Sequence, residues 1–234
     1  MEWVRALVFQ GKALGGGWLM ASDARLLLVL ALLVEGVLGG LALAWARLRG
    51  GGAIELGAVL PGLAFGLVYA GFLVFVNYCL LRVLPPTKPV EAVRRFYRGV
   101  VQPLFREATA LDILGISLAA GIGEELLFRG ALQSEFGIVL ASVAFGLAHV
   151  GGRESIAFGL WVFVLGIGLG VLVPLTGGIL AAVVAHVVYD AAAMSYMRYD
   201  LAGDVRRQQN ARVCNADGDD TGNRAWLSEG EDGS

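Results

Sequence analysis

Long apolar stretches without charge constrain this chain more than any other feature of its sequence. Residues 57–81, for example, contain no charged side chain. A stretch of about 20 apolar residues is long enough to cross the hydrocarbon core of a bilayer as a helix. Hydrophobic residues make up 57% of the chain and charged residues 16%, and the mean hydropathy is +0.69. The sequence therefore predicts an all-α, polytopic membrane helix bundle and excludes an ordinary soluble domain.

The apolar stretches predict about six transmembrane helices, at 26–46, 57–81, 111–128, 136–150, 155–173 and 176–194. After Met197 the sequence becomes polar and acidic, which is typical of a segment that buries too little surface to fold. We therefore expect four parts: an N-terminal cytoplasmic or interfacial segment (1–25), two transmembrane helices plus a basic interfacial connection (26–104), a further helix bundle (105–197) and a polar disordered tail (198–234).

The positive charges predict the orientation in the membrane. With six spans, all of the 18 Lys and Arg residues except Arg47, Arg49 and Arg129 lie on one side. Because positive loops stay inside, both termini are expected in the cytoplasm of a multi-pass cell-membrane protein. Residues 90–105 alternate basic and apolar side chains at helical spacing and predict a helix along the interface. In this orientation Glu124 lies nearer the non-cytoplasmic half, so the side from which the site opens stays undecided.

Two adjacent carboxylates stand in the third apolar stretch. Carboxylates in a membrane span are costly, so Glu124 and Glu125 are by default a functional-site hypothesis. Arg129 follows Glu125 by one helical turn and is expected to pair with it. Glu124 is rotated about 100° away and faces a different neighbour. Gly121 and Gly123 would let another helix or a substrate backbone approach closely.

Both histidines of the chain, His149 and His186, also lie in apolar stretches. His149 follows Phe145 by one turn, and His186 precedes Asp190 by one turn. If the third, fourth and sixth spans pack together, Glu124, His149, His186 and Asp190 converge on one pocket. Taken singly, each of these residues could be structural, and Phe145 is expected to pack. Their coincidence in separate spans favours a site.

Two chemistries fit such a set. Glu124 could take a proton from water while the imidazoles stabilise an oxyanion. Alternatively, His149 and His186 with Glu124 could hold a divalent metal such as zinc. The sequence leaves both open. Glu35, Glu55 and Asp112 look like span-end or interfacial groups, although Glu35 lies too deep in its span for that account.

Three short motifs resemble those of the CAAX-processing and bacteriocin-processing (CPBP) family of intramembrane proteases. Residues 124–129 (EELLFR) look like its EExxxR motif, 145–149 (FGLAH) like FxxxH, and 186–190 (HVVYD) like HxxxN/D. Their order and separation also agree. The resemblance covers roughly residues 105–195.

The resemblance implies a glutamate-dependent peptidase, or metalloprotease, of an all-helical membrane fold. Glu124 would activate the attacking water, with Glu125 and Arg129 in support, and His149 and His186 would stabilise the intermediate or bind a metal. Asp190 stands where the eukaryotic prenyl-protein proteases look to have Asn. An ionised Asp cannot donate to an oxyanion, so its expected role is to orient His186 or bind a metal.

The expected partners are a peptide or membrane-protein substrate and the lipid bilayer, with no nucleic acid. Two other classes of function remain possible at this point. One is a non-catalytic immunity or scaffold protein of the same fold. The other is a proton-coupled transporter that uses Glu and His as a relay, which the absence of an inverted repeat disfavours.

Overall fold

A computed structural model describes residues 19–49, 54–105 and 108–200 of the chain. The predicted N-terminal segment lies outside the described residues up to residue 18, and the predicted disordered tail lies outside them from residue 201. Between these limits the first helix already begins at residue 19 and the last continues to residue 200.

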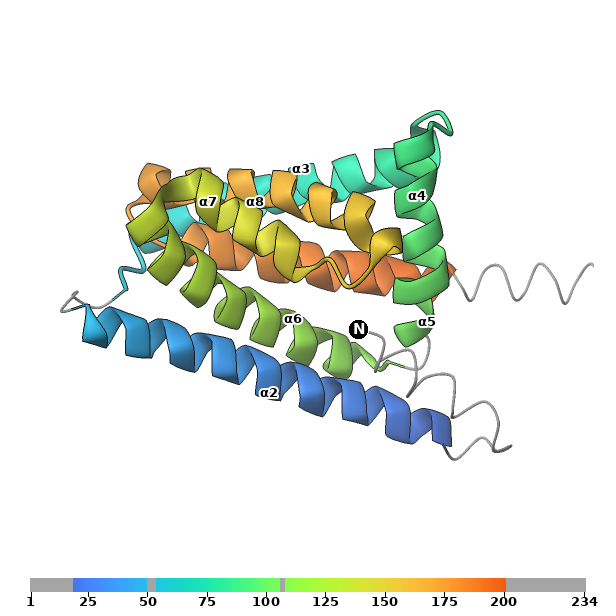
Figure 1. Ribbon diagram of the computed structural model, residues 1–234, viewed down its shortest axis with the longest axis horizontal. Coiled ribbons are helices and arrows are strands. Elements are labelled where there is room, and N and C mark those ends of the chain that lie inside the picture. Colours follow the sequence, from blue (N-terminus) through green and yellow to red (C-terminus); the bar gives the residue numbers. More distant parts are fainter. Residues whose placement is uncertain (1–18, 50–53, 106–107, 201–234) are drawn as a thin grey trace, which may run out of the picture.

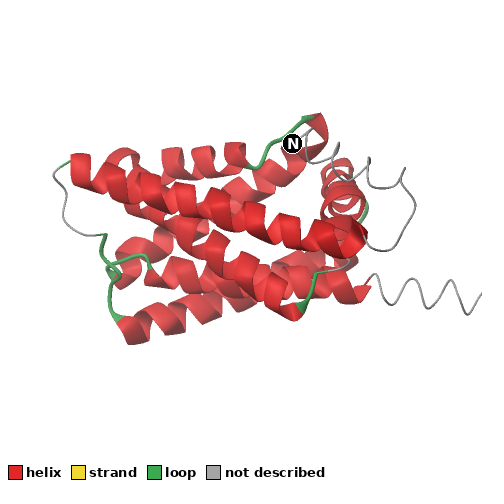
Figure 2. Ribbon diagram, turned by 90° about the horizontal axis from the view of Figure 1, so that it is seen from below, coloured by secondary structure: helices red, strands yellow, loops and turns green. Residues whose placement is uncertain are grey.

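The described residues form helices joined by short loops, with no strand among them (Figure 2). This confirms the predicted all-α membrane bundle. Five helices are long and apolar enough to cross a membrane, by length and composition. The elements in chain order are α2 (Leu19–Leu48), α3 (Val59–Tyr78), η2 (Cys79–Val83), α4 (Lys88–Phe96), η3 (Tyr97–Val101), α5 (Gln102–Leu104), α6 (Ala110–Glu125), η4 (Leu126–Leu132), α7 (Gln133–Ala148), η5 (Arg153–Ser155), α8 (Ile156–Thr176) and a last helix, Leu180–Asp200.

The third and fourth predicted spans are the two arms of one continuous helical segment, Ala110–Ala148. Gly137 interrupts it with φ 80° and ψ 170°, a backbone conformation that favours glycine. Figure 1 shows α6 and α7 running in opposite directions on either side of this point. Arg129, which the charge count had assigned to one side of the membrane, lies in η4 inside the bundle with 2% of its surface exposed.

Local signals explain where two of these helices begin and end. At the start of α6, Asp112 Oδ2 accepts the backbone N–H of Thr109 at 2.7 Å, while Thr109 Oγ1 accepts that of Asp112 at 3.2 Å. This reciprocal capping satisfies two donors of the first turn and accounts for Asp112 as a span-end group. The helix α8 continues through Pro174 and ends at Gly177, whose φ of 74° is left-handed. The sequence had placed this end too early, at Pro174.

The connection between α3 and α6 forms a helix that crosses one end of the bundle. Figure 1 shows α4 standing roughly perpendicular to the long helices. Arg94 fixes its position by donating to the carbonyl oxygens of Leu80 at 2.9 Å and Leu84 at 2.7 Å. The helix predicted here is therefore present, and its place at the membrane interface stays a prediction.

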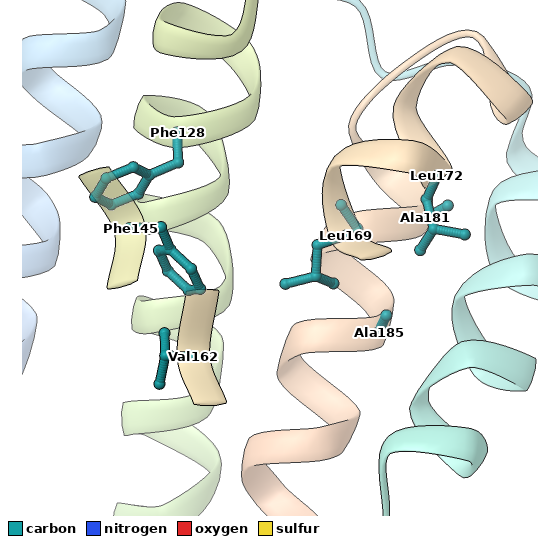
Figure 3. Packing of buried hydrophobic residues seen from close by; sticks show 8 residues of the cluster. Phe128, Phe145, Val162, Leu169, Leu172, Ala181 and Ala185 are labelled. Carbon is teal, nitrogen blue, oxygen red and sulfur yellow. The ribbon is translucent and has the colours of Figure 1, made fainter. Parts of the chain in front are cut away.

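A buried apolar cluster joins both arms of the hairpin to α8 and the last helix. Figure 3 shows Phe128, Phe145 and Val162 as one group, and Leu169 with the small residues of the last helix as another. Alanines at 181, 182 and 185 have no exposed surface. Small side chains let neighbouring helices approach closely, as membrane bundles require.

Hydrogen bonds hold the last helix near both of its described ends. At its start, the N–H groups of Ile179 and Leu180 donate to the carbonyls of Glu55 and Leu56, each at 3.0 Å. Near its other end, Arg82 donates to the hydroxyl of Tyr196 and pairs with Asp200. The sites on this helix, His186 and Asp190, lie between these two attachments.

Candidate active site

The ion pair predicted between Glu125 and Arg129 is present and fully buried. Arg129 Nη1 lies 3.0 Å from Glu125 Oε1, and the two side chains are 1% and 0% exposed. Arg129 Nη2 also donates to the carbonyl oxygen of Gly166 at 3.2 Å. Its guanidinium carbon lies 4.3 Å from the centre of the Phe145 ring, which adds a cation–π contact. Three elements, α6, α7 and α8, therefore fix this arginine.

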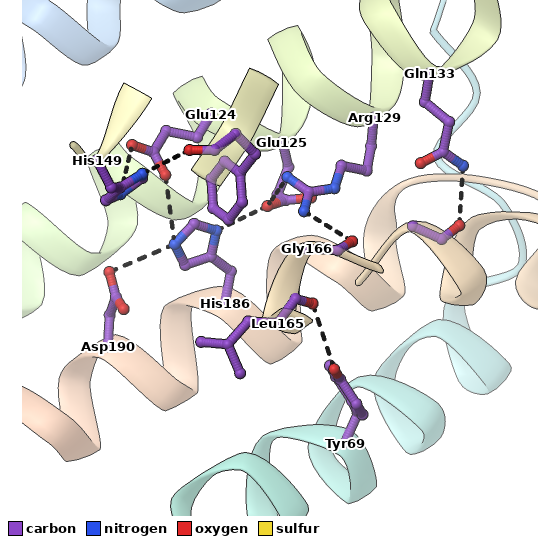
Figure 4. A network of polar contacts seen from close by, with 12 residues as sticks. Tyr69, Glu124, Glu125, Arg129, Gln133, His149, Leu165, Gly166, His186 and Asp190 are labelled. Atoms are coloured by element: carbon purple, nitrogen blue, oxygen red, sulfur yellow. Dashed lines mark hydrogen bonds and ion pairs between the residues drawn. The ribbon is translucent and has the colours of Figure 1, made fainter. Parts of the chain in front are cut away.

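Glu125 also binds a histidine, which the sequence did not reveal. Its Oε1 lies 2.8 Å from His186 Nδ1, across 61 residues of sequence (Figure 4). Because Arg129 holds this carboxylate as an acceptor, Nδ1 of His186 carries the hydrogen. The other ring nitrogen, Nε2, then faces away from Glu125. Glu125 thus positions His186.

The second imidazole is held in the same way by a backbone group. Nδ1 of His149 lies 2.9 Å from the carbonyl oxygen of Phe145, one turn earlier. A carbonyl only accepts hydrogen bonds, so this Nδ1 is the donor. Nε2 of His149 is therefore the nitrogen left to face the site.

Glu124 lies where the two free nitrogens converge. Its Oε1 is 3.8 Å from His149 Nε2 and its Oε2 is 3.6 Å from His186 Nε2. Asp190 Oδ2 approaches the same nitrogen of His186, also at 3.6 Å. These separations exceed a direct hydrogen bond and suit a bridging water molecule. The structure therefore brings Glu124, His149, His186 and Asp190 together, as Figure 4 shows.

The Phe145 ring lies beside both imidazoles. Its centre is 5.0 Å from that of His149 and 5.9 Å from that of His186, with edge-to-face angles of 67° and 84°. The ring is 3% exposed. Phe145 therefore packs, as expected, and its backbone and ring together orient both histidines.

These groups open onto a cavity of about 140 Å³. A cavity of this size has room for several water molecules. Apart from the polar groups its walls are apolar and aromatic; the lining residues are Leu73, Ala120, Glu124, Phe145, His149, Phe158, Trp161, Val162, Leu165, Leu169, His186, Tyr189 and Asp190. A larger cavity of about 460 Å³ reaches Arg129 from the hairpin end, but neither histidine nor Glu124 nor Asp190 lines it. The smaller cavity is therefore the candidate site.

The side chains of this site do not meet the requirements of a metal centre as they are placed. No group of three or more His, Cys, Asp and Glu side chains among the described residues could hold a metal ion. We therefore derive no step through a metal.

Two glycines before the carboxylates permit the close helix contacts that the sequence predicted. A Cβ on Gly121 would overlap Val187 of the last helix, and a Cβ on Gly123 would lie 2.6 Å from the backbone oxygen of Glu35 in α2. Gly121 therefore brings α6 against the helix that carries His186. Gly123 brings it against α2.

Comparison with known proteins agrees with this geometry. Residues 106–192 match the family described as type II CAAX prenyl endopeptidase Rce1-like. This region of the chain is similar to the CAAX-protease family. The matched range contains all six of the residues predicted for the site, whereas α2 and α3 lie outside it. The match supports a CAAX-protease-like intramembrane protease fold.

One curated relative is an uncharacterized protein, YpbD, of Bacillus subtilis (strain 168). It is 27% identical over 112 residues, which cover 48% of this chain and 58% of that protein. The chain therefore spans little more than half the length of this relative. No solved structure matches the chain.

Proposed function

We propose that this chain is an intramembrane endopeptidase of the CAAX-protease-like type, in which Glu124 activates the attacking water. The observation that carries the proposal is the placement of the Glu124 carboxylate 3.6 and 3.8 Å from the free nitrogens of two imidazoles. A water molecule bridging these groups has its acceptor and its neighbours already in place. The similarity of residues 106–192 to a family of endopeptidases supports the same reaction class.

The hydrolysis follows from the atoms available. The oxygen of a water beside Glu124 attacks the peptide carbonyl, and one proton of that water passes to the Glu124 carboxylate. The C–O bond forms while the carbonyl becomes an oxyanion. When the C–N bond breaks, the oxyanion returns to a carbonyl and Glu124 gives its proton to the leaving amine. Glu124 therefore serves first as base and then as acid.

The two imidazoles would stabilise the oxyanion by donating from Nε2 when they are protonated. His186 suits this role because three carboxylates, Glu124, Glu125 and Asp190, approach its ring nitrogens within 3.6 Å. An ionised Asp190 only accepts, so it supports the charge of His186 rather than the oxyanion. Glu125 and Arg129 act as positioning residues behind the imidazole.

The substrate in this proposal is a peptide or a segment of a membrane protein. The apolar and aromatic walls of the cavity favour an apolar chain or a lipid-modified peptide over a charged one. From the positive-charge bias, we propose that both termini lie in the cytoplasm. A prenylated C-terminal peptide is the first probe to test, because the matched family is described as prenyl endopeptidases.

The test uses the full-length chain purified in detergent or reconstituted in vesicles. Internally quenched peptides, one farnesylated with a CAAX terminus and others apolar but unmodified, report cleavage. We expect Glu124→Gln to lower kcat by about 10²- to 10⁴-fold, the usual contribution of a group that transfers a proton. His149→Ala and His186→Ala should also lose activity, while the thermal unfolding midpoint of Glu124→Gln stays near that of the wild type.

Glu91→Gln is the matched control, because Glu91 is an exposed carboxylate on α4 paired only with Arg95. If no peptide is cleaved, proteins trapped in cells by Glu124→Gln identify the natural substrate. Rescue of a deletion strain by Glu124→Gln as fully as by the wild type would show a scaffold or immunity protein instead. Elemental analysis of the active, purified chain would detect a metal that the described side chains do not suggest.

A further inference from the structure

Glu35 is a half-buried carboxyl group that the mechanism above leaves without a role. It lies in the middle of α2, on the one strip of that helix which the protein covers. Its Oε2 is buried and has no hydrogen-bond partner. A carboxyl group in the centre of a membrane helix is costly, and an unpartnered oxygen increases that cost. Packing alone gives no reason for an acid here.

Glu35 contacts the backbone directly before the proposed base. A Cβ built on Gly123 would lie 2.9 Å from Glu35 Oε2 and 3.0 Å from Glu35 Cβ. The glycine therefore leaves the space that the Glu35 side chain occupies. Glu124 is the next residue, and Glu35 interacts electrostatically with Glu124, His186 and Asp190. Two sequence-distant helices thus place two carboxyl groups at one site.

The charges of the site require a proton on a carboxyl group. Besides Glu35, the titratable and charged groups of the site are Glu124, Glu125, Arg129, His149, His186 and Asp190. With every carboxyl ionised and both imidazoles neutral, four carboxylates and one guanidinium would leave a net charge of −3. Protonating both imidazoles would still leave −1, which a buried, low-dielectric site does not tolerate.

Glu35 is the carboxyl best suited to carry that proton. Glu124 faces the free nitrogens of both imidazoles, and Asp190 approaches that of His186. Glu125 is held as an anion by Arg129 and His186. Glu35 forms no ion pair with any Lys, Arg or His of the part of the chain that the structure describes. A buried carboxyl without a cation adopts its neutral form. In that form it gains an O–H donor.

We propose that protonated Glu35 is a positioning residue of the active site, donating a hydrogen bond to Glu124 directly or through the catalytic water. This inference rests on the proposed function. The donor keeps Glu124 ionised and holds its carboxylate against the two imidazoles, where it takes the proton of the attacking water. Because α2 lies outside the region that matches the family, Glu35 is a contribution of the N-terminal part of this chain.

Infrared spectroscopy of the purified full-length chain tests the proton without any substrate. The carbonyl band of a protonated carboxyl group should be present in the wild type and absent from Glu35→Gln, with Glu91→Gln as the unchanged control. The same band should shift in Glu124→Gln, because its acceptor has changed. A band that survives Glu35→Gln, or one that does not respond to Glu124→Gln, would overturn the inference whether or not the chain is a peptidase. One equivalent of bound divalent metal would also overturn it, by supplying the missing positive charge.

Kinetics test the positioning role. Glu35→Leu should lower kcat by about 10- to 100-fold, the strength of one hydrogen bond to a charged group, with little change in KM. Glu35→Gln should restore most of that loss, because its amide also donates and is neutral. Equal activity of Glu35→Leu and the wild type would refute the role, and equal loss in both variants would show that an amide donor does not replace the acid. An inactive wild type with the expected infrared shifts would instead refute the peptidase proposal alone.

Discussion

The helix α2 and the helices that carry the site differ in how far the protein covers them. In the most apolar part of α2, 11% is buried inside the protein. In the corresponding part of the span that contains α8, the buried share is 39%. Polar groups with several partners, such as Arg129 and Glu125, lie where helices cover each other from several sides. In α2, polar Glu35 lies on the single covered strip, near Gly39 and Ala42. In this bundle, polar side chains within the spans therefore lie where other helices cover them.

Breaking the buried ion pair should give the largest loss of stability. Arg129→Met leaves the Glu125 carboxylate buried without its cation, which costs about 3–5 kcal/mol. Thermal or denaturant unfolding in detergent measures this loss. The double variant Glu125→Gln/Arg129→Met should recover much of it, because no charge is then left unpaired. A double variant as unstable as the single one would show that Arg129 acts through packing alone.

Adding one methyl group should change the stability differently in the covered helices and in α2. Gly121→Ala should destabilise the protein by about 1–3 kcal/mol, since the new Cβ overlaps Val187 and lies 3.1 Å from its backbone nitrogen. The matched change Gly36→Ala in α2 meets no atom within 4 Å and should be neutral or slightly stabilising. Unfolding of both variants under the same conditions makes the comparison. Equal losses would contradict the one-sided contact of α2.

Asp190→Asn tests a group at the edge of the site. The amide keeps the shape of the side chain but removes the charge that lies 3.6 Å from His186 Nε2. We expect kcat to fall about tenfold, a change of about 1.4 kcal/mol in the barrier. This is less than the loss expected for Glu124→Gln. A loss as large as that of Glu124→Gln would give Asp190 a direct part in proton transfer.

The smallest effect is expected at the exposed pair of Arg49 and Glu135. Their side chains meet at 2.8 Å, but 60% of the Arg49 side chain is exposed. Ion pairs in water contribute little, so Arg49→Gln should leave the unfolding midpoint unchanged within error. A clear loss of stability would mean that this pair is shielded from water.

Most of the fold could be predicted from the sequence because apolar length and charge govern membrane helices directly. Arg129 was counted with the charges on one side of the membrane because it lies between two apolar stretches, although its spacing from Glu125 also predicted the ion pair. The turn itself depends on Gly137, whose φ is 80°. Nothing in the sequence distinguishes this glycine from the many others.

The contacts of the site divide in the same way. Relations within one helix were predictable from spacing: Arg129 with Glu125, His149 with Phe145, and His186 with Asp190. The contact of Glu125 with His186 spans 61 residues and depends on how two helices pack, which spacing does not give. For Glu35 the sequence supplied a signal, because its carboxyl group lies too deep in its span. The sequence did not show that Gly123 is its neighbour.

The two attachments of the last helix have a mechanical consequence. A helix that is attached near both ends bends little at its centre, where His186 and Asp190 lie. One attachment is the pair of backbone hydrogen bonds at Ile179 and Leu180. The other is the contact of Arg82 with Tyr196 and Asp200. The α2 helix, by contrast, rests against α6 and η4 on one side. A movement that admits a long substrate is therefore expected to displace α2, while the last helix keeps its site residues in place.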